Sequence, residues 1–303
     1  MEGLDARETA ARLPYPGLAD SIREVMDGRR DGKLDAPSRV VLSLPEGGNL
    51  LVMPAADDEL AITKLVTIHP ENAQRELPTI QGEVVVMEAR TGTRLGILDG
   101  GAATARRTAA LSLLAARTLA RRPDGPLLIV GAGTQARSHL EAFREGLGVS
   151  KVLLTSRATE RAVSLAEHAR SLGMDARVVD GPAEALDEVS LIVTATTNGD
   201  PMLPEEVPEG VFIAAVGAFD PEMAELAPGL VGGSSVVVDT IEGVREEAGD
   251  LIWAQRAGAF DWEDATQLED AMLWGESPAE PVVFKSGGHA LWDLAAARTA
   301  FGS

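Results

Sequence analysis

Short runs of alternating apolar and polar residues fill the first hundred positions of the chain. Gly, Pro and Asp separate these runs, a pattern that is typical of half-buried antiparallel strands. The predicted strands cover residues 39–45, 48–55, 59–69, 82–89 and 94–100. Before them, Leu18, Ile22 and Val25 form an apolar stripe on an amphipathic helix predicted at residues 15–29. This part of the chain therefore predicts a mostly antiparallel sheet preceded by a helix.

From Thr104 the pattern changes to a long helix rich in alanine and leucine, which ends before Pro123. After it, apolar strands alternate with helices predicted at residues 134–146 and 159–171. The predicted strands are 127–131, 151–155, 176–179, 189–195, 211–216 and 235–239. Continuous apolar strands separated by helices indicate a parallel sheet covered on both faces, as in a doubly wound α/β domain. A last strand and an amphipathic helix, within residues 281–301, are suited to complete the first domain.

The composition narrows the classes of function. The 303-residue chain has a formal net charge of −20, and an acidic surface repels nucleic-acid phosphates and anionic lipids. It has no cysteine, which excludes disulfides and thiol chemistry and fits a reducing compartment. The amino terminus lacks a signal-peptide pattern, and no apolar run reaches the ~20 residues that span a bilayer. These features predict a soluble cytoplasmic protein without nucleic-acid or membrane partners.

The segment LLIVGAGTQA, residues 127–136, joins an apolar strand to a helix through two glycines. In a doubly wound sheet the first strand-to-helix turn is tight and lets the backbone approach a diphosphate. These needs fall on Gly131, Gly133 and Ala136. The amide groups and dipole of the helix then hold the diphosphate. The apolar strand before the turn and the apolar stripe after it favour a dinucleotide site over a glycine pair that only ends a strand.

The end of the next strand indicates which dinucleotide is bound. Where an acid would accept the ribose hydroxyls of NAD, the chain has Ser156 and Arg157, and a guanidinium suits the 2′-phosphate of NADP. This predicts NADPH, with NADH as the alternative, although an arginine at the start of a helix is also common without such a role. Thr196, Thr197 and Asn198 follow a later strand, where polar groups suit ribose or nicotinamide.

Three cations are candidates for holding an acidic substrate. Strand alternation places Lys64 on the apolar face that Ile62 and Val66 share, where an unpaired charge is costly. Arg107 lies on an apolar helical stripe, and Arg39 begins a strand. The alternative for each is an ordinary salt bridge or an apolar stem with its charge in water, and for a single arginine this is the more common case. Spacing alone does not show whether the fold brings the three together.

Other polar residues give weaker signals. Asp293, near the start of the last helix, is interpreted as a complement to the helix dipole, and His289 as a packed or solvated side chain. No His, Asp and Glu cluster has the spacing of metal ligands, so no metal is predicted. No nucleophile elbow supports a serine triad.

Five segments combine these features. They are LPTIQGEVVVMEARTGTRLGILDGGAATARRTAA, LLIVGAGTQARSHLEAF, VTATTNGDP, VGAFDPEMAEL and FKSGGHALWDLAAA. Together they resemble the ornithine cyclodeaminase/mu-crystallin family along nearly the whole chain. The resemblance implies a homodimer, a substrate with an α-carboxylate, and a Rossmann domain inserted into a substrate-binding domain. We therefore expect an α+β substrate-binding and dimerisation domain at residues 1–112 and 284–303, and a dinucleotide-binding (Rossmann) α/β domain at 113–283.

The resemblance also implies roles for individual residues. Arg39, Lys64 and Arg107 match the substrate-holding cations of the family, and Lys64 is the catalytic candidate. The implied cofactor-binding residues are Thr108, Gly131, Gly133, Thr134, Gln135, Ala136, Ser156, Arg157, Thr196, Thr197, Val216 and Gly217. Cyclodeaminases have an aspartate where this chain has Phe219, and Asp220 follows one residue later. The chain therefore resembles the ketimine reductase branch.

That branch implies hydride transfer from NADPH to the C=N carbon of Δ1-pyrroline-2-carboxylate or Δ1-piperideine-2-carboxylate, giving L-proline or L-pipecolate. Arg107 and Arg39 are expected to hold the carboxylate, and Lys64 to orient the substrate and supply or relay a proton. Phe219 is expected to bind substrate as an apolar wall. The alternatives are an ornithine or lysine cyclodeaminase, an amino-acid dehydrogenase of the same family, and a non-catalytic NADPH or ligand binder. The sequence does not distinguish the two ring sizes, since one methylene changes binding by only ~1–3 kcal/mol.

Overall fold

The computed structural model describes residues 2–197 and 199–302, which form two compact units. Unit 1 contains Met1–Leu111 and His289–Ser303, and unit 2 contains Ser112–Gly288. The sequence had assigned residues 284–288 to the first domain, which is wrong. Strand β14 (Val282–Lys285) is paired on both sides in the sheet of unit 2, and the chain enters unit 1 only after it.

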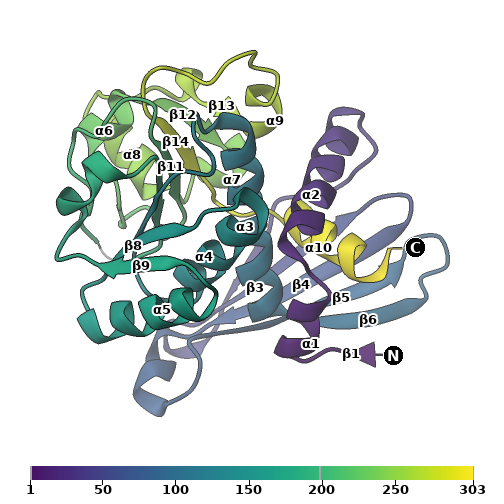
Figure 1. The fold of residues 1–303 in the computed structure, drawn as a ribbon. Helices are drawn as coiled ribbons and strands as arrows, with labels where there is room; N and C mark the ends of the chain where they lie inside the picture. Colours follow the sequence, from purple (N-terminus) through teal and green to yellow (C-terminus); the bar gives the residue numbers. More distant parts are fainter. Residues whose placement is uncertain (1, 198, 303) are drawn as a thin grey trace. The chain divides into compact units, whose positions relative to one another are not determined.

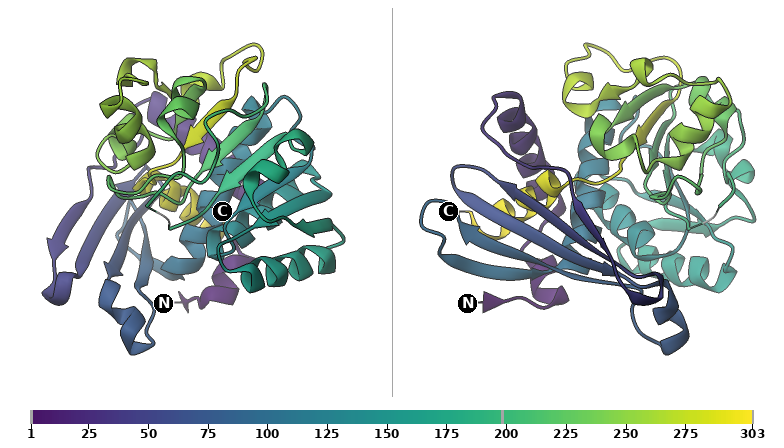
Figure 2. Two further views of the ribbon diagram at one scale, coloured as in Figure 1. Left: turned by 90° about the vertical axis from the view of Figure 1, so that its left-hand side faces the viewer. Right: turned by 180° about the vertical axis from the view of Figure 1, so that it is seen from behind.

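Unit 1 is built on a six-stranded sheet in the order β1-β6-β5-β4-β3-β2. The strands are β1 (Glu2–Gly3), β2 (Val40–Ser43), β3 (Asn49–Ala56), β4 (Leu60–Ile68), β5 (Ile80–Glu88) and β6 (Arg94–Asp99). Strands β2 to β6 are antiparallel neighbours, and the short β1 runs parallel to β6. The predicted mostly antiparallel sheet is confirmed, and Figure 2 shows its long blue strands from behind.

Helices α2 (Tyr15–Arg30) and α10 (Ala290–Phe301) pack against one another in unit 1, and α10 also packs on β3 and β4 (Figure 1). The predicted stripe of α2 is confirmed, because Leu18 and Ile22 are completely buried. Ser21 Oγ donates a hydrogen bond of 3.1 Å to the carbonyl of Ala295. The C-terminal helix is therefore part of the core of unit 1. The remaining short helices of this unit are α1 (Ala6–Ala11), η1 (Pro45–Gly47) and η2 (Pro70–Arg75).

Helix α3 (Gly100–Leu119) begins four residues before the predicted start at Thr104. The sequence instead predicted Gly100 as the last residue of the strand at 94–100. The side chain of Asp99 accepts a 2.7 Å hydrogen bond from the amide of Ala102, which caps the first turn. A Cβ at Gly100 would lie 2.5 Å from the backbone of Gly82 in β5, so the helix can start this close to the sheet only with glycine there.

Unit 2 is built on an eight-stranded sheet in the order β13-β12-β14-β11-β10-β7-β8-β9, in which every pairing is parallel. The strands besides β14 are β7 (Leu127–Val130), β8 (Lys151–Thr155), β9 (Asp175–Val178), β10 (Leu191–Thr194), β11 (Phe212–Ala215), β12 (Ser235–Val238) and β13 (Thr266–Gln267). The chain runs outward from β7 to β9 and then returns to β10 on the other side of β7. This is the strand order of a doubly wound sheet, with its switch point between β7 and β10.

Helices cover both faces of this sheet. Helices α4 (Thr134–Leu147) and α5 (Thr159–Ser171) lie side by side against β7 to β10 (Figure 1). An apolar cluster also joins Leu128 and Val130 of β7 to Leu230 of α6 (Pro228–Gly232) and Leu251 of α8 (Gly249–Arg256). The remaining helices are α7 (Ile241–Val244), α9 (Leu268–Ala271), η3 (Pro182–Glu184), η4 (Leu186–Glu188) and η5 (Trp262–Asp264). The predicted α/β fold is therefore confirmed.

Among the residues that the structure describes, no helix combines the length and the apolar character needed to span a bilayer.

Asp57 provides a test of how α10 is attached to unit 1. One carboxylate oxygen accepts from the amides of Glu59 and Leu60, and the other accepts a 2.7 Å hydrogen bond from Arg298 of α10. We expect Asp57→Ala to lower the free energy of unfolding by about 1.5–3 kcal/mol, because buried donors lose their charged partner. Urea denaturation measures the change. The matched control Asp58→Ala removes an exposed neighbour, and an equal loss in both variants would contradict this role of Asp57.

Candidate functional site

Strand β4 carries a buried lysine. Lys64 is 3% exposed and lies on the same face of the strand as the buried Ile62 and Val66, so the predicted alternation is confirmed. Its Nζ donates 2.6 Å and 3.0 Å hydrogen bonds to Thr104 Oγ1 of α3 and to Asp293 Oδ1 of α10. Three segments of unit 1 that are distant in the sequence therefore meet at this ammonium group.

Arg107 joins the same cluster from the next turn of α3. Its side chain is 8% exposed, and its Nε lies 3.6 Å from Asp293 Oδ1, which is too long for a hydrogen bond. Arg107 Nε and Asp293 Oδ2 are both buried without a hydrogen-bond partner. Such groups are costly inside a protein unless something else binds them. The cluster thus has two cations, one carboxylate and unused donor capacity, which suits an added anion.

The environment of Lys64 alters its acidity. Burial, together with the positive charges of Arg107 and Arg39, lowers the pKa of Lys64 to about 8, although the charge of Asp293 opposes these effects. Near neutral pH the amine is therefore mostly protonated but gives up its proton far more readily than an exposed lysine. A lysine of this kind is suited to proton transfer.

The other predicted residues of unit 1 lie at or near this cluster. Arg39 is half-buried, directly precedes β2 and is close enough for its charge to act on Lys64. Thr108 follows Arg107 on α3 and is 7% exposed. The structure thus brings Lys64 and Arg107 together, with Arg39 within electrostatic range.

Asp293 is the residue that the sequence interpretation underestimated. It does lie in the first turn of α10, as a dipole-complementing acid would. It is also fully buried and is the ion-pair partner of both Lys64 and Arg107. The available signal was an acid within the run ALWDLAAA, whose other members are apolar. A charge in such a run requires a buried partner.

Unit 2 contains a cavity of ≈ 450 Å³ at the carboxyl ends of the central strands. Its lining includes six of the predicted cofactor residues, namely Gly131, Gly133, Ser156, Arg157, Thr196 and Thr197. The lining also includes Arg161 and Asp180, which the sequence interpretation did not single out. Arg161 lies in the first turn of α5, four positions after Arg157, so this part of the cavity has two cations where one was expected.

The two glycines of the first turn are suited to their positions for different structural reasons. Gly131 has φ +119°, and a Cβ there would lie 2.4 Å from the carbonyl oxygen of Ala195, so only glycine fits. Around Gly133 a Cβ would meet nothing within 4 Å, and no side chain caps the helix that begins at Thr134. Free amides beside open space form a site for a diphosphate. The cavity therefore fits a dinucleotide that spans the switch point.

The remaining predicted residues of unit 2 have varied surroundings. Ala136 is fully buried against the sheet, whereas Thr134 is exposed. Gln135 Oε1 is buried without a hydrogen-bond partner and is an acceptor available to a ligand hydroxyl. Val216 and Gly217 follow β11, and Phe219 next to them is 49% exposed. Asn198 lies outside the described residues.

Within residues 2–197 and 199–302, no group of three or more His, Asp or Glu side chains is arranged to hold a metal ion.

The profile of the ornithine cyclodeaminase/mu-crystallin family matches residues 6–302. Two relatives each cover 98% of this chain and 94% of their own length. They are Δ1-pyrroline-2-carboxylate reductase 1 of Burkholderia multivorans, 39% identical, and the Δ1-pyrroline-2-carboxylate/Δ1-piperideine-2-carboxylate reductase of Azospirillum brasilense, 36% identical.

Solved structures match both units as well. Thermococcus litoralis Δ1-pyrroline-2-carboxylate reductase in complex with NADH and L-proline has a TM-score of 0.91 and 29% identity, covering 99% of this chain and 96% of that one. An archaeal alanine dehydrogenase dimer with bound NAD has a TM-score of 0.89 and 28% identity, covering 99% of this chain and 94% of its own.

The ion pair with Asp293 gives a testable effect on the acidity of Lys64. Asp293 raises the pKa of Lys64 against the effect of burial, so Asp293→Asn is expected to move the pKa downward from about 8. The pH dependence of Lys64 modification by an amine-reactive reagent, followed by peptide mass spectrometry, measures this pKa. Asp57→Asn, a carboxylate that pairs with Arg298 instead, is the control and leaves it unchanged. A rise in the Asp293→Asn variant would refute this role of Asp293.

Proposed function

Because the chain belongs to the ornithine cyclodeaminase/mu-crystallin family, we propose that it is a ketimine reductase. It reduces Δ1-pyrroline-2-carboxylate, and Δ1-piperideine-2-carboxylate, to L-proline and L-pipecolate. The observation that carries the proposal is the buried cluster of Lys64, Arg107 and Asp293, which has unused donor capacity for a small carboxylate. The relatives named for this activity, and the related structure that binds NADH and L-proline, support it.

Arg107 and Arg39 hold the substrate carboxylate in this proposal. A guanidinium offers two parallel N–H groups to a carboxylate, and burial strengthens the interaction by excluding water. Asp293 lies on one side of the Arg107 guanidinium, 3.6 Å from its Nε, and balances part of its charge. A bound carboxylate would also neutralise the excess positive charge of the cluster.

Lys64 orients the substrate and supplies or relays the proton that the ring nitrogen carries in the product. Its lowered pKa makes this transfer easier, and Thr104 and Asp293 fix the position of its ammonium group. Reduced nicotinamide, when bound, supplies the hydride to the C=N carbon. The protein contributes mainly by positioning, because a cyclic imine that is protonated on nitrogen is already electrophilic.

The residues that hold the cofactor lie in unit 2. Gly131, Gly133 and the first amides of α4, at Thr134 to Ala136, bind the diphosphate. Ser156 and Arg157 bind the adenosine ribose and its 2′-phosphate, with Arg161 as a second cation. Thr196, Thr197, Val216 and Gly217 bind the nicotinamide end of the cofactor, and Thr108 of α3 is a further cofactor-binding residue in this proposal. Related structures hold NADH or NAD; the preference for NADPH is our proposal from the cations that line the cavity.

The segment after β11 favours reduction over cyclodeamination. Phe219 takes the place at which cyclodeaminases have an aspartate, and it provides an apolar wall for the substrate. Asp220, the rival acid, is exposed, and its side chain accepts a 2.9 Å hydrogen bond from the amide of Glu222. This hydrogen bond stabilises the local turn at Pro221.

We also propose that the protein acts as a homodimer in the cytoplasm. Strand β2 at the edge of the unit 1 sheet exposes Val40, Val41 and Leu42, each about half exposed. An apolar edge strand of this kind favours association. A related alanine dehydrogenase is described as a dimer.

The oxidation of NADPH in the presence of each cyclic imine, followed at 340 nm, tests the activity. We expect turnover without added ammonia. Arg107→Gln is expected to lower kcat/KM by about 30-fold or more, because removing one member of a buried charge pair costs ~2–5 kcal/mol. Lys64→Met is also expected to lower kcat/KM. Lys33→Met, which changes an exposed lysine, is the control.

Other outcomes would assign another function. Ammonia released from ornithine without added cofactor would indicate a cyclodeaminase. Turnover only with an open-chain 2-oxo acid and ammonia would indicate an amino-acid dehydrogenase. NADPH binding without turnover of either imine would indicate a ligand-binding protein.

The cofactor preference has a separate test. Arg157→Asp replaces a positive charge that lines the cavity by a negative one, which should repel a 2′-phosphate. We expect the ratio of kcat/KM for NADPH over NADH to fall by about 10- to 100-fold, the equivalent of one charge-assisted hydrogen bond. Arg256→Asp makes the same charge change at an exposed position on α8 and serves as the control. An unchanged ratio in Arg157→Asp would contradict the proposed 2′-phosphate site.

A further inference from the structure

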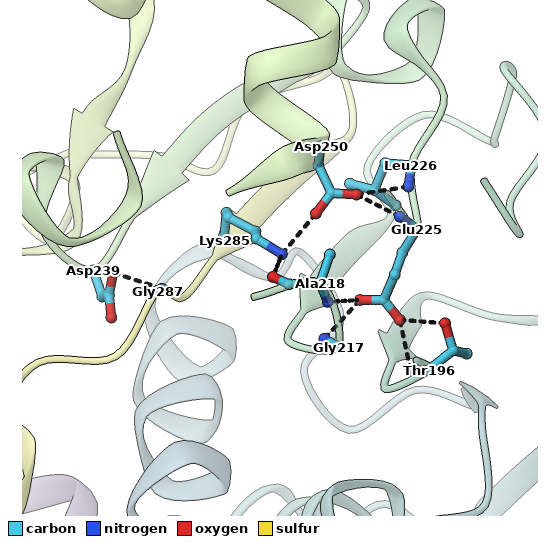
Figure 3. A network of polar contacts seen from close by, with 9 residues as sticks. All are labelled: Thr196, Gly217, Ala218, Glu225, Leu226, Asp239, Asp250, Lys285 and Gly287. Atoms are coloured by element: carbon cyan, nitrogen blue, oxygen red, sulfur yellow. Dashed lines mark hydrogen bonds and ion pairs between the residues drawn. The ribbon is translucent and has the colours of Figure 1, made fainter. Parts of the chain in front are cut away.

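A buried ionic network in unit 2 has no role in the function proposed so far. It consists of Glu225, Asp250 and Lys285, none of which has any exposed surface, and we call it the Glu225 network (Figure 3). Glu225 lies in the segment after β11, Asp250 in the first turn of α8, and Lys285 at the end of β14. Two carboxylates and one ammonium group in an apolar interior call for an explanation.

The Glu225 carboxylate joins two loops that follow neighbouring strands. Oε1 accepts hydrogen bonds from the amide and the hydroxyl of Thr196, at 2.7 and 3.0 Å, after β10. Oε2 accepts from the amides of Gly217 and Ala218, at 2.7 and 3.3 Å, after β11. Figure 3 shows both oxygens pointing to these loops. One side chain therefore fixes the spacing between the two loops.

Asp250 and Lys285 hold this arrangement from behind. Asp250 Oδ1 accepts hydrogen bonds from the amides of Glu225 and Leu226, at 2.6 and 2.9 Å. Its Oδ2 forms a 2.6 Å ion pair with Lys285 Nζ, which also donates a 2.7 Å hydrogen bond to the carbonyl of Ala218. Ala218 is thus bound through its N–H by Glu225 and through its C=O by Lys285. The backbone directly before Phe219 has little freedom to rotate.

The close approach of the loops depends on glycine at one position. A Cβ at Gly217 would lie 2.2 Å from the carbonyl oxygen of Thr196 and 2.4 Å from Glu225 Oε1. The two loops are therefore in direct contact around the carboxylate. A larger residue here would separate them.

Burying the three charged groups of the Glu225 network costs free energy that apolar side chains at the same positions would not. Burial raises the pKa of Glu225, as does the charge of Asp250, whereas Lys285 and the amide donors lower it. Apolar residues of similar volume often give equal or greater stability than a buried ion pair. What apolar residues cannot supply is an acceptor for four donors in two loops. Loop geometry is therefore the property that the network provides.

The loops are those that face the nicotinamide end of a dinucleotide. Ser156 and Arg157 follow β8 on one side of β7, and the diphosphate turn follows β7 itself. A dinucleotide that spans the switch point places its other half over the ends of β10 and β11. We propose that Glu225 is a positioning residue for that half: it sets the Thr196 and Gly217–Ala218 backbones against the nicotinamide riboside. This inference rests on the proposed cofactor site.

Binding of the whole cofactor and of its adenosine half separates this role from a general effect on folding. Glu225→Gln keeps the shape but presents an amide N–H₂ to backbone donors, so one loop loses its acceptor. We expect the Kd of NADPH to rise at least tenfold, while the Kd of adenosine 2′,5′-bisphosphate stays within twofold. Isothermal titration calorimetry measures both, and the fluorescence of bound NADPH reports on the nicotinamide environment.

Asp239→Asn is the matched control. Asp239 is 1% exposed and likewise accepts hydrogen bonds from backbone amides and a hydroxyl, at Thr240, Ser286, Gly287 and Gly288. We expect the ratio of the two dissociation constants to stay unchanged in this variant. If Glu225→Gln does not fold, the charge-neutral Asp250→Asn/Lys285→Gln variant is judged by the same ratio.

The possible failures are distinguishable. If Glu225→Gln weakens the binding of both ligands equally, or of neither, the positioning role is overturned. The proposed cofactor site is unaffected by either result. Failure of the unaltered protein to bind NADPH, NADH or adenosine 2′,5′-bisphosphate would instead refute the proposed function and, with it, this inference.

Discussion

The ion pair between Lys64 and Asp293 is the contact on which unit 1 depends most. It links a strand and a helix that are 229 positions apart in the sequence, and both charges are almost completely shielded from water. A buried ammonium without this carboxylate would be strongly destabilised, and so would the carboxylate without the ammonium. The pair therefore fixes α10 against the sheet. It also leaves Arg107 with a donor that no protein group satisfies, which is the starting point for binding an acid.

The same solution, buried charge held by a small number of well-placed partners, recurs in unit 2. There the Glu225 network faces backbone amides, so it orders loops instead of binding a ligand directly. The net charge of −20 makes both clusters informative. In such an acidic chain a positive site for an anion has to be built from local contacts, and the chain has only four lysines beside its arginines. Two of these lysines, Lys64 and Lys285, are the buried ones in these clusters.

Much of this organisation could be predicted from the sequence because it follows local rules. Strand alternation placed Lys64 correctly, and the apolar strand before Gly131 identified the first turn of the parallel sheet. The predictions failed where a long-range contact decides the structure. The start of α3 depends on a close approach to Gly82, and β14 belongs to unit 2 because of its pairing with β11 and β12. The roles of Asp293 and Glu225 depend on partners that only the tertiary fold brings near.

The position of α10 after unit 2 has a consequence for synthesis on the ribosome. The sheet of unit 1 emerges first, but the helix that covers β3 and β4 follows only after all of Ser112–Gly288 has been translated. During this interval the nascent sheet of unit 1 exposes an apolar face that carries Lys64 without its partner Asp293. By the time α10 is translated, unit 2 has all of its strands, because the last of them, β14, ends at Lys285. The later unit is thus able to fold before the earlier one, and the nascent chain presents a binding surface for chaperones throughout that interval.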